Sequence, residues 1–386
     1  MRLGPADYVT AFVVSGALAW LLTPLMLRVA LRRSILDVPD SREGKAQASP
    51  VPYLGGLAIV LAFVATVLVA GLVLDPPRGV RQLSAVLGMG LLLSLMGLLD
   101  DVRGLSPFLR VAVEITAGVV VYASDPQITF PGPEWLDLLV TVLWVVGVTN
   151  AFNLLDNMDG LSAGVATIAS LAFCAIAAVN GQYLVAALSA ALAGCASGFL
   201  RHNFHPAKIY MGDAGSLFLG YLLAFLAIRL KLADTPRLVA LGVPVLVLGV
   251  ALFDTTLVTF NRLRHGRSPM RGGRDHTSHR LVWVGIPVPI SVGLIYGLAT
   301  SLGFLGFLLV RLDTVSGLML VGFVMAVALA LFLLLSAVPV YETSRNRLTM
   351  LRVVREHEPE PPAGAGPTIV LDDQSDDAGA RVRARR

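Results

Sequence analysis

Long apolar segments recur along this chain of 386 residues, and they limit its fold more than any other feature. A transmembrane helix needs about 20 consecutive apolar residues, because it rises about 1.5 Å per residue across a hydrocarbon core of about 30 Å. We count about eleven such segments, near residues 8–30, 53–74, 82–99, 108–124, 136–152, 161–179, 182–200, 214–230, 238–260, 290–310 and 316–340. They predict a polytopic integral membrane protein.

The fold class follows from what a bilayer tolerates. Open sheet edges cannot face lipid, and the segments lack the short alternation of barrel strands, so we expect an all-α fold. Residues 1–30 are too long for the apolar core of a signal peptide, and we expect a retained first helix there. Cys174 and Cys195 lie in separate segments without metal-binding spacing, and we expect both to be buried as small apolar residues.

Basic residues are distributed unevenly between alternate loops. One set of loops holds most of the arginines and lysines, whereas the other holds only Arg78, Arg81, Lys231, Arg237 and Arg311. The positive-inside rule therefore places the N-terminus outside and the C-terminus in the cytoplasm. The net charge of +4 reflects this bias. Because no basic stripe is interleaved with aromatic residues, we do not expect nucleic-acid binding.

The C-terminal part of the chain differs in composition from the rest. We predict a membrane domain over residues 1–345, with its functional loops in the cytoplasm, followed by a tail over residues 346–386. The tail is rich in Pro, Ala, Gly and acidic residues and ends in RVRARR. Such a composition buries too little apolar surface to offset the entropy of ordering, so we expect a disordered cytoplasmic tail.

Four polar clusters fall on the predicted cytoplasmic side, and the first is Asp100-Asp101 at the end of an apolar segment. Two adjacent carboxylates at a helix C-terminus are disfavoured by the helix dipole and by each other. A bound cation or a role in proton transfer would relieve that cost. The alternative is a solvated pair that simply marks the end of the helix.

The second cluster is NAFNLLDNMDGLSAG, residues 150–164. If the preceding helix continues into it, the polar residues spread over about half of the helix circumference, because each residue turns about 100°. These residues are Asn150, Asn153, Asp156, Asn157 and Asp159. Acids this close to lipid favour a functional site. The alternative is an interfacial helix end at which Asp159 caps the next helix.

The third cluster, YMGDAGSL, contains Asp213 between Gly212 and Gly215, where we expect a helix to begin. Glycines allow close backbone approach, and a helix N-terminus offers free N–H groups to a phosphate. Asp213 adds a hard oxygen ligand of the kind that Mg²⁺ prefers. The site would suit a magnesium-bound phosphate, with an ordinary aspartate cap as the alternative.

The fourth cluster is the loop over residues 261–280, NRLRHGRSPMRGGRDHTSHR. Its arginines, Arg274 among them, form with the histidines a cationic loop that could hold a diphosphate through charge-assisted hydrogen bonds. His276 and His279 are three residues apart and could share a helix face. Zinc binding is a weak alternative because no cysteine accompanies them. Positive-inside charge alone is another, and Asp254 in the preceding apolar segment could orient a neighbouring cluster.

The chemistry of these clusters favours transfer of a phosphate-containing group from a cytosolic donor to a lipid acceptor. An ion-coupled transporter is the competing class, although transporters usually bind near the bilayer midplane. A phosphatidyl-type transferase with a CDP-linked substrate is another candidate. Asp156, Asp159, Gly160 and Ala163 match the opening of its DxxDGxxAR motif, but the later GxxxDxxxD half is missing.

Four motifs occur in an order that resembles the polyprenyl-phosphate N-acetylhexosamine-1-phosphate transferases. They are GLLDD (97–101), NAFNLLDNMDG (150–160), MGDAGS (211–216) and GRSPMRGGRDHTSH (266–279). The segment KAQASPVPYLGG, starting at Lys45, is similar to the first cytoplasmic loop of that family. The resemblance covers about residues 8–340.

The resemblance implies an enzyme of the bacterial cytoplasmic membrane that transfers a sugar 1-phosphate from a UDP-sugar to polyprenyl (undecaprenyl) phosphate and releases UMP. It implies Mg²⁺, with Mn²⁺ as an alternative ion, and leaves a homodimer open. Either direct attack by the lipid phosphate or a covalent aspartyl intermediate fits the family. Cell-envelope polymers such as teichoic acid or lipopolysaccharide begin with this step.

Site residues are carried over by motif. Asp100 and Asp101 would handle the lipid phosphate, one of them as general base, and Asp156 would join them as a catalytic carboxylate. Asn153 and Asp213 would approach the metal ion. The substrate-binding residues would be Lys45 and Asp159 near the uridine, His276 and His279 at the diphosphate, and Asn150 and Arg274 beside them.

The chain departs from the family pattern at three places. Asn157 stands where Gly is usual, Gln47 stands where His is usual, and DHTSH lacks the two adjacent histidines of the family motif. The muramoyl-pentapeptide branch typically has three consecutive histidines. Their absence favours a UDP-GlcNAc-type donor, with phospho-N-acetylmuramoyl-pentapeptide transfer as the alternative.

Replacing Asp213 by Asn should abolish turnover while the protein stays folded in detergent, because the amide lacks the charge that a metal ligand supplies here. Turnover and thermal unfolding of purified Asp213→Asn measure the two effects separately. Near-normal activity would remove Asp213 from the metal site.

Overall fold

The computed structural model describes residues 4–37, 50–73, 80–124, 133–232, 235–270 and 272–341, all within the compact unit Met1–Tyr341. The predicted tail and Lys45 lie outside these ranges. The elements before the middle of the chain are α1 (Pro5–Arg32), β1 (Leu36–Asp37), β2 (Val51–Pro52), α2 (Gly55–Val73), α3 (Val80–Arg103), α4 (Pro107–Ser124) and α5 (Glu134–Leu155). The remaining ones are α6 (Leu161–Val179), α7 (Tyr183–Asn203), α8 (Asp213–Arg229), α9 (Arg237–Val247), α10 (Gly249–Arg264), α11 (Thr277–Trp283), α12 (Val288–Leu309) and α13 (Thr314–Ser336).

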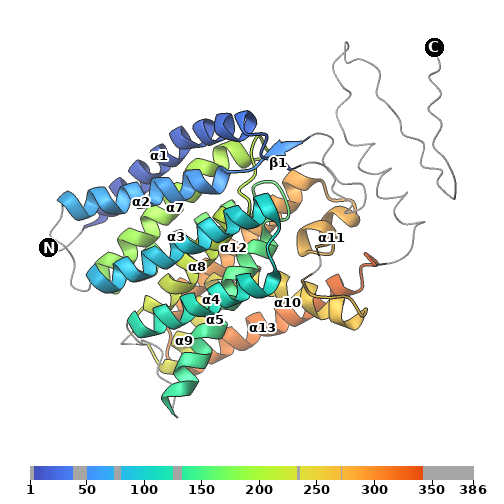
Figure 1. The fold of residues 1–386 in the computed structure, drawn as a ribbon. Helices are drawn as coiled ribbons and strands as arrows, with labels where there is room; N and C mark the ends of the chain where they lie inside the picture. Colours follow the sequence, from blue (N-terminus) through green and yellow to red (C-terminus); the bar gives the residue numbers. More distant parts are fainter. Residues whose placement is uncertain are drawn as a thin grey trace. The chain divides into compact units, whose positions relative to one another are not determined.

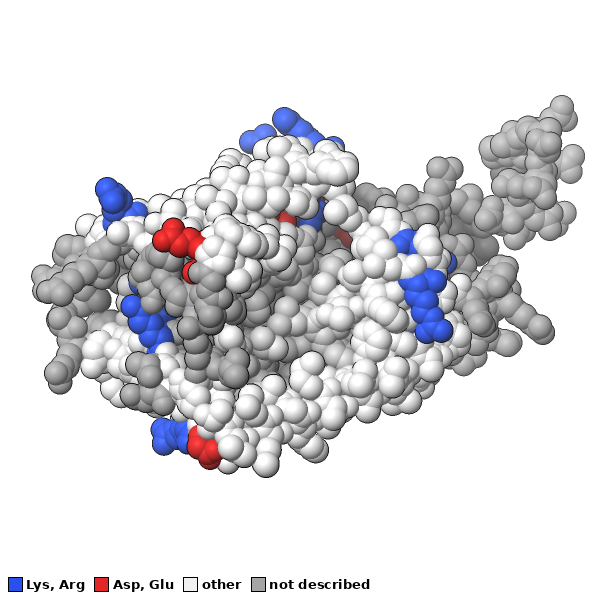
Figure 2. Space-filling view, turned by 90° about the horizontal axis from the view of Figure 1, so that it is seen from below, with Lys and Arg blue, Asp and Glu red and all other residues white. Residues whose placement is uncertain are grey.

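The prediction of an all-α membrane protein is confirmed. Within the described ranges, nine helices are long and apolar enough to cross a bilayer, and strand structure is limited to the short antiparallel pair β1–β2. Each predicted segment coincides with a helix, except that residues 238–260 form the pair α9 and α10, bent by 77°. Most of the described surface in Figure 2 carries neither acidic nor basic side chains, as lipid contact requires.

The helices lie side by side with the central ones enclosed by the others (Figure 1). α8 is buried from Ala214 to Ile228 and packs against α2, α3 and α5. A helix that is apolar all round is expected in such a position. Its N-terminal residue, Asp213, is half-buried at the end of this enclosed helix.

The break between α9 and α10 redirects the chain toward that end. It falls at Leu248, just before Gly249 and one turn after Pro244. Gly and Pro are the usual causes of a sharp bend, since Pro lacks a backbone N–H and Gly tolerates unusual dihedrals. The bend sets the direction of α10, which carries Asp254 and Arg262.

Small residues bring α1 and α7 into close contact. A Cβ at Gly198 would collide with the carbonyl oxygen of Gly16, and one at Gly194 would collide with Ser15 and the carbonyl of Phe12. Helices in membranes associate through such small-residue faces, because lipid supplies little hydrophobic driving force between them.

Gly198→Ala should therefore lower the unfolding temperature in detergent by several degrees, because α1 and α7 must separate to admit the methyl group. The matched control is Gly293→Ala in α12, where an added Cβ would meet nothing within 4 Å and where alanine favours the helix. Thermal unfolding followed by intrinsic fluorescence compares the two variants. Equal stability of both would contradict the close contact.

Candidate active site

Arg110, near the start of α4, connects side chains from three other helices. Its guanidinium donates to Asp100 Oδ2 at 2.8 Å, to Asp213 Oδ2 at 2.9 Å and to Asn153 Oδ1 at 2.8 Å. Asn153 in turn donates to Asp213 Oδ1 at 2.7 Å and to Ser216 Oγ at 3.0 Å. We call Asp100, Asp101, Arg110, Asn153 and Asp213 the carboxylate cluster. It brings together three of the predicted motifs.

Asp101 has a different environment from Asp100. Its carboxylate accepts hydrogen bonds from the backbone N–H groups of Asp213 at 3.1 Å and Ala214 at 3.4 Å, so it caps the N-terminus of α8 from the end of α3. The helices can approach because Gly97 and Gly212 have no side chain at the contact, and Gly212 has a φ of +71°. The positive end of α8 thus offsets the cost of adjacent carboxylates.

The loop before α8 is anchored on α2. The backbone N–H of Gly55 donates to the carbonyl of Tyr210 at 3.0 Å, and that of Gly56 donates to the carbonyl of Met211 at 2.9 Å. These are N–H groups of the first turn of α2, which have no partner within their own helix. The pairing fixes the start of the MGDAGS motif.

The second predicted cluster is only partly helical. α5 ends at Leu155, so the polar helix face comprises Asn150 and Asn153, and the chain then turns through Gly160, whose φ is +77°. Asn157 donates to the carbonyl of Leu154 at 2.8 Å, a group left free by the helix end. Gly160 is the N-cap of α6, and glycine adopts its left-handed conformation more readily than other residues, so the chain can turn there into α6.

Asp159 does not cap α6, whose N-cap is Gly160. Its carboxylate accepts from His205 Nδ1 at 2.9 Å and from the backbone N–H of Ala207 at 3.0 Å. It therefore joins the α5–α6 turn to the loop that follows α7. That loop leads into the MGDAGS motif.

Asp156, the C-cap of α5, is half-buried, and among the described residues no hydrogen bond or ion pair involves its carboxylate. Burial, together with the charges of Asp213, Asp101 and Asp159, raises its pKa to about 8. The Asp156 carboxyl group therefore holds its proton near neutral pH.

α11 carries the predicted histidines. His276 Nδ1 lies 2.8 Å from Asp254 Oδ2, and the N–H of Thr277 donates to Asp254 Oδ1 at 2.6 Å. Asp254 and His276 are 1% and 3% exposed, and the ring centroids of His276 and His279 are 5.8 Å apart. We call Asp254, His276, Ser278 and His279 the histidine cluster. Asp254 orients it, as the sequence suggested.

His279 is held in its neutral form. Burial lowers its pKa to about 3, and the neighbouring charges of His276 and Arg274 act in the same direction. Its Nδ1 is buried without a hydrogen-bond partner in the described part of the chain. A neutral imidazole with a free ring nitrogen can donate to or accept from a bound substrate.

Two arginines of the loop serve its own structure. Arg262 donates to both carboxylate oxygens of Asp275, at 2.8 and 2.7 Å, and Tyr341 donates to Asp275 Oδ2. Burial would raise the pKa of Asp275, but these hydrogen bonds outweigh it and lower the value. Arg280 donates to the carbonyls of Asp275 and Leu335, tying α11 to the end of α13. Arg262 and Arg280 of the predicted cationic loop therefore hold the loop in place through hydrogen bonds within the protein.

Arg110 and Glu114 are not among the predicted site residues, although both interrupt an apolar segment and such charges mark functional sites by default. Glu114 is fully buried and accepts a hydrogen bond from Asn150. The hydrogen bond joins Asn150 on α5 to α4, one turn away from Asn153 and Arg110.

Within the described ranges, no three His, Cys, Asp or Glu side chains converge as a metal site would require. The oxygens of Asp100, Asp213 and Asn153 instead converge on the guanidinium of Arg110. They are hard donors of the kind Mg²⁺ prefers, and they already hold a cation. The donor set therefore fits a magnesium ion in its chemistry.

The fold and the site together define a polytopic membrane protein with acidic, amide, arginine and histidine side chains gathered at one end of its helices. The profile of glycosyl transferase family 4 matches residues 83–231. The probable undecaprenyl-phosphate N-acetylglucosaminyl 1-phosphate transferase of Bacillus subtilis (strain 168) is 32% identical over 75% of this chain and 81% of its own length.

Two further relatives are similar. The decaprenyl-phosphate N-acetylglucosaminephosphotransferase of Mycobacterium leprae (strain TN) is 32% identical over 63% of this chain and 69% of its own length. The phospho-N-acetylmuramoyl-pentapeptide-transferase of Bacillus subtilis (strain 168) is 35% identical over 57% and 73%. The chain belongs to the polyprenyl-phosphate N-acetylhexosamine-1-phosphate transferases of glycosyl transferase family 4.

Replacing Asp156 by Asn should stabilise the protein more at high pH than at low pH. The folded state binds this proton with a pKa of about 8, well above the unfolded value of about 3.9, so the stability it contributes is lost as pH rises through 8. Unfolding temperatures of wild type and Asp156→Asn at pH 5 and pH 9, both in EDTA to keep divalent ions away, measure the effect. The same difference at both pH values would contradict it.

Proposed function

We propose that the protein transfers N-acetylglucosamine 1-phosphate from UDP-GlcNAc to a polyprenyl phosphate such as undecaprenyl phosphate, with release of UMP. The observation that carries the proposal is the convergence of Asp100, Asn153 and Asp213 on Arg110, since it brings three family motifs into one polar cluster. Relatives named for N-acetylglucosaminyl 1-phosphate transfer to prenyl phosphates support it. The reaction would open the synthesis of a cell-envelope polysaccharide.

The proposed topology puts this cluster at the cytoplasmic surface of the bacterial inner membrane. Counting α8 and the bent pair of α9 and α10 as one span each gives eleven spans, with the N-terminus outside. A cytosolic nucleotide sugar and a lipid phosphate can then meet at the membrane surface. A lipid acceptor also accounts for a site that is built from the ends of spanning helices.

Mg²⁺ is the expected cofactor, with Mn²⁺ as an alternative. Asp213 and Asn153 would hold it beside Asp100, and when bound it would neutralise charge on the donor diphosphate. Arg110 lies against the same oxygens and would contribute charge-assisted hydrogen bonds to a phosphate.

The remaining groups divide into proton carriers and diphosphate ligands. Both oxygens of Asp101 accept hydrogen bonds from α8, and both oxygens of Asp100 accept them from Leu105 and Arg110. Asp156 is therefore the better candidate for proton transfer or nucleophilic attack, with Asp100 and Asp101 as the motif-based alternatives. A pKa of about 8 lets Asp156 exchange a proton near neutral pH. Neutral His279 would hydrogen-bond the diphosphate, while Arg274 would supply positive charge beside it.

The decisive assay gives the purified protein undecaprenyl phosphate, Mg²⁺ and, in separate reactions, UDP-GlcNAc, UDP-GalNAc and UDP-MurNAc-pentapeptide. We expect UMP and lipid-linked sugar with UDP-GlcNAc, and neither product when EDTA replaces Mg²⁺. Turnover of the muramoyl donor alone would move the protein to the alternative branch. No UMP with any donor, while a known relative is active in the same mixture, would reject the proposal.

A further inference from the structure

The two clusters of the site come from separate parts of the chain, and their spacing has to be set by contacts between them. The carboxylate cluster lies on α3, α4, α5 and α8, whereas the histidine cluster lies on α10 and α11. A substrate that contacts both is sensitive to an error of about 1 Å in their separation. The contacts between α11 and the α5–α6 turn therefore matter for function.

Asn157 and Ser278 form such a contact. Ser278 Oγ donates to Asn157 Oδ1 at 2.6 Å, and Asn157 Nδ2 donates back to the carbonyl of Leu154 at the end of α5. Ser278 is 1% exposed. Among the residues that the structure describes, this is the hydrogen bond that joins α11 to residues 150–164, the stretch that carries Asn153, Asp156 and Asp159.

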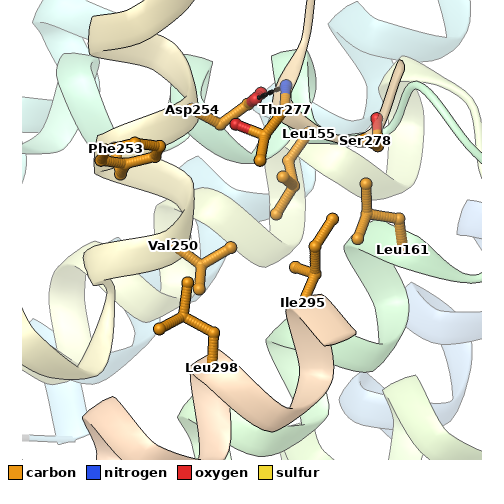
Figure 3. Close-up of a pocket in the computed structure, with 9 residues that line it drawn as sticks. All are labelled: Leu155, Leu161, Val250, Phe253, Asp254, Thr277, Ser278, Ile295 and Leu298. Carbon is orange, nitrogen blue, oxygen red and sulfur yellow. Dashed lines mark hydrogen bonds between the residues drawn. The ribbon is translucent and has the colours of Figure 1, made fainter. Parts of the chain in front are cut away.

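The packing of α11 on this side leaves a small gap. An apolar pocket lies next to it, and in Figure 3 Thr277, Ser278 and Asp254 occupy one end of that pocket. The rest of its lining is apolar and comes from four other helices: Leu155, Leu161, Val250, Phe253, Ile295 and Leu298. Side chains that leave space between them lose part of their dispersion contacts, so a directional hydrogen bond adds to what packing does at this face of α11.

We infer that Asn157 and Ser278 are a pair of positioning residues that set the spacing of the two clusters and thereby the fit of the nucleotide-sugar diphosphate. The inference rests on the proposed function. The pair also lies where this chain departs from the family pattern, with Asn at 157 where Gly is usual and Ser278 inside the DHTSH segment that lacks two adjacent histidines.

The first experiment is a double-mutant cycle with Asn157→Ala, Ser278→Ala and the double variant. Each single variant should lower kcat/KM for the nucleotide sugar about three- to tenfold, the range of one buried hydrogen bond. The double variant should lose no more than the worse single one, because either substitution already removes the contact. KM for polyprenyl phosphate should not change. Losses that multiply, or that fall equally on both substrates, would overturn the inference.

The second experiment exchanges side-chain size across the contact. Ser278→His alone should be strongly impaired, because the ring would meet Asn157 in a buried site. Asn157→Gly together with Ser278→His should regain most of the lost activity. If the double variant is no better than Ser278→His, the two positions are not coupled and the inference fails.

Two control variants replace the same residue types away from the site, where each side chain bonds a carbonyl of its own helix. Asn180 donates to the carbonyl of Ile176 at the far end of α6, and Ser301 donates to Gly297 on the exposed face of α12. Asn180→Ala and Ser301→Ala should keep wild-type kinetics. Should wild type release no UMP with any donor, the proposed function fails, while the contact is still tested by non-additive changes in unfolding temperature within the same cycle.

Discussion

The site depends on one cation held among oxygen atoms inside the end of a helical bundle. Arg110 pairs with Asp100 and Asp213 and bonds Asn153, and these residues come from four helices. Charges placed away from water are costly unless they are paired and hydrogen-bonded. Here each charge has partners, so the electrostatic cost of a polar site next to lipid is offset by contacts that also align the helix ends.

The histidine cluster is held in a different way from the carboxylate cluster. A buried carboxylate fixes the orientation of one imidazole, and burial keeps the other imidazole neutral. Asp254 holds His276, while His279 has a pKa of about 3. The loop before α11 is braced separately by Arg262, Asp275 and Tyr341. A rigid frame of this kind lets substrate-binding groups keep their positions without a substrate, which lowers the cost of organising them during reaction.

The sequence predicted a large part of this arrangement. The helical segments, the gathering of Asn153 with Asp213 and the orienting role of Asp254 were all expected and are present. The role of Arg110 does not follow from its segment, whose apolar composition predicts a membrane span but not which side chains the guanidinium meets. The partner of Asp159 could not be anticipated, since His205 lies in a loop 46 residues away whose path depends on the packing of α7.

By itself, the sequence determined the class of protein and the chemistry that it carries. Uninterrupted apolar segments require helices in a bilayer, and ordered motifs of acids, amides and histidines indicate phosphate chemistry. Only the tertiary structure decided which carboxylate caps α8, which one holds a proton near neutral pH, and that Asn157 meets Ser278 across 121 positions. The physical reason is that a pKa or a hydrogen bond depends on neighbours brought together by packing, whereas spacing along the chain determines only local helix geometry.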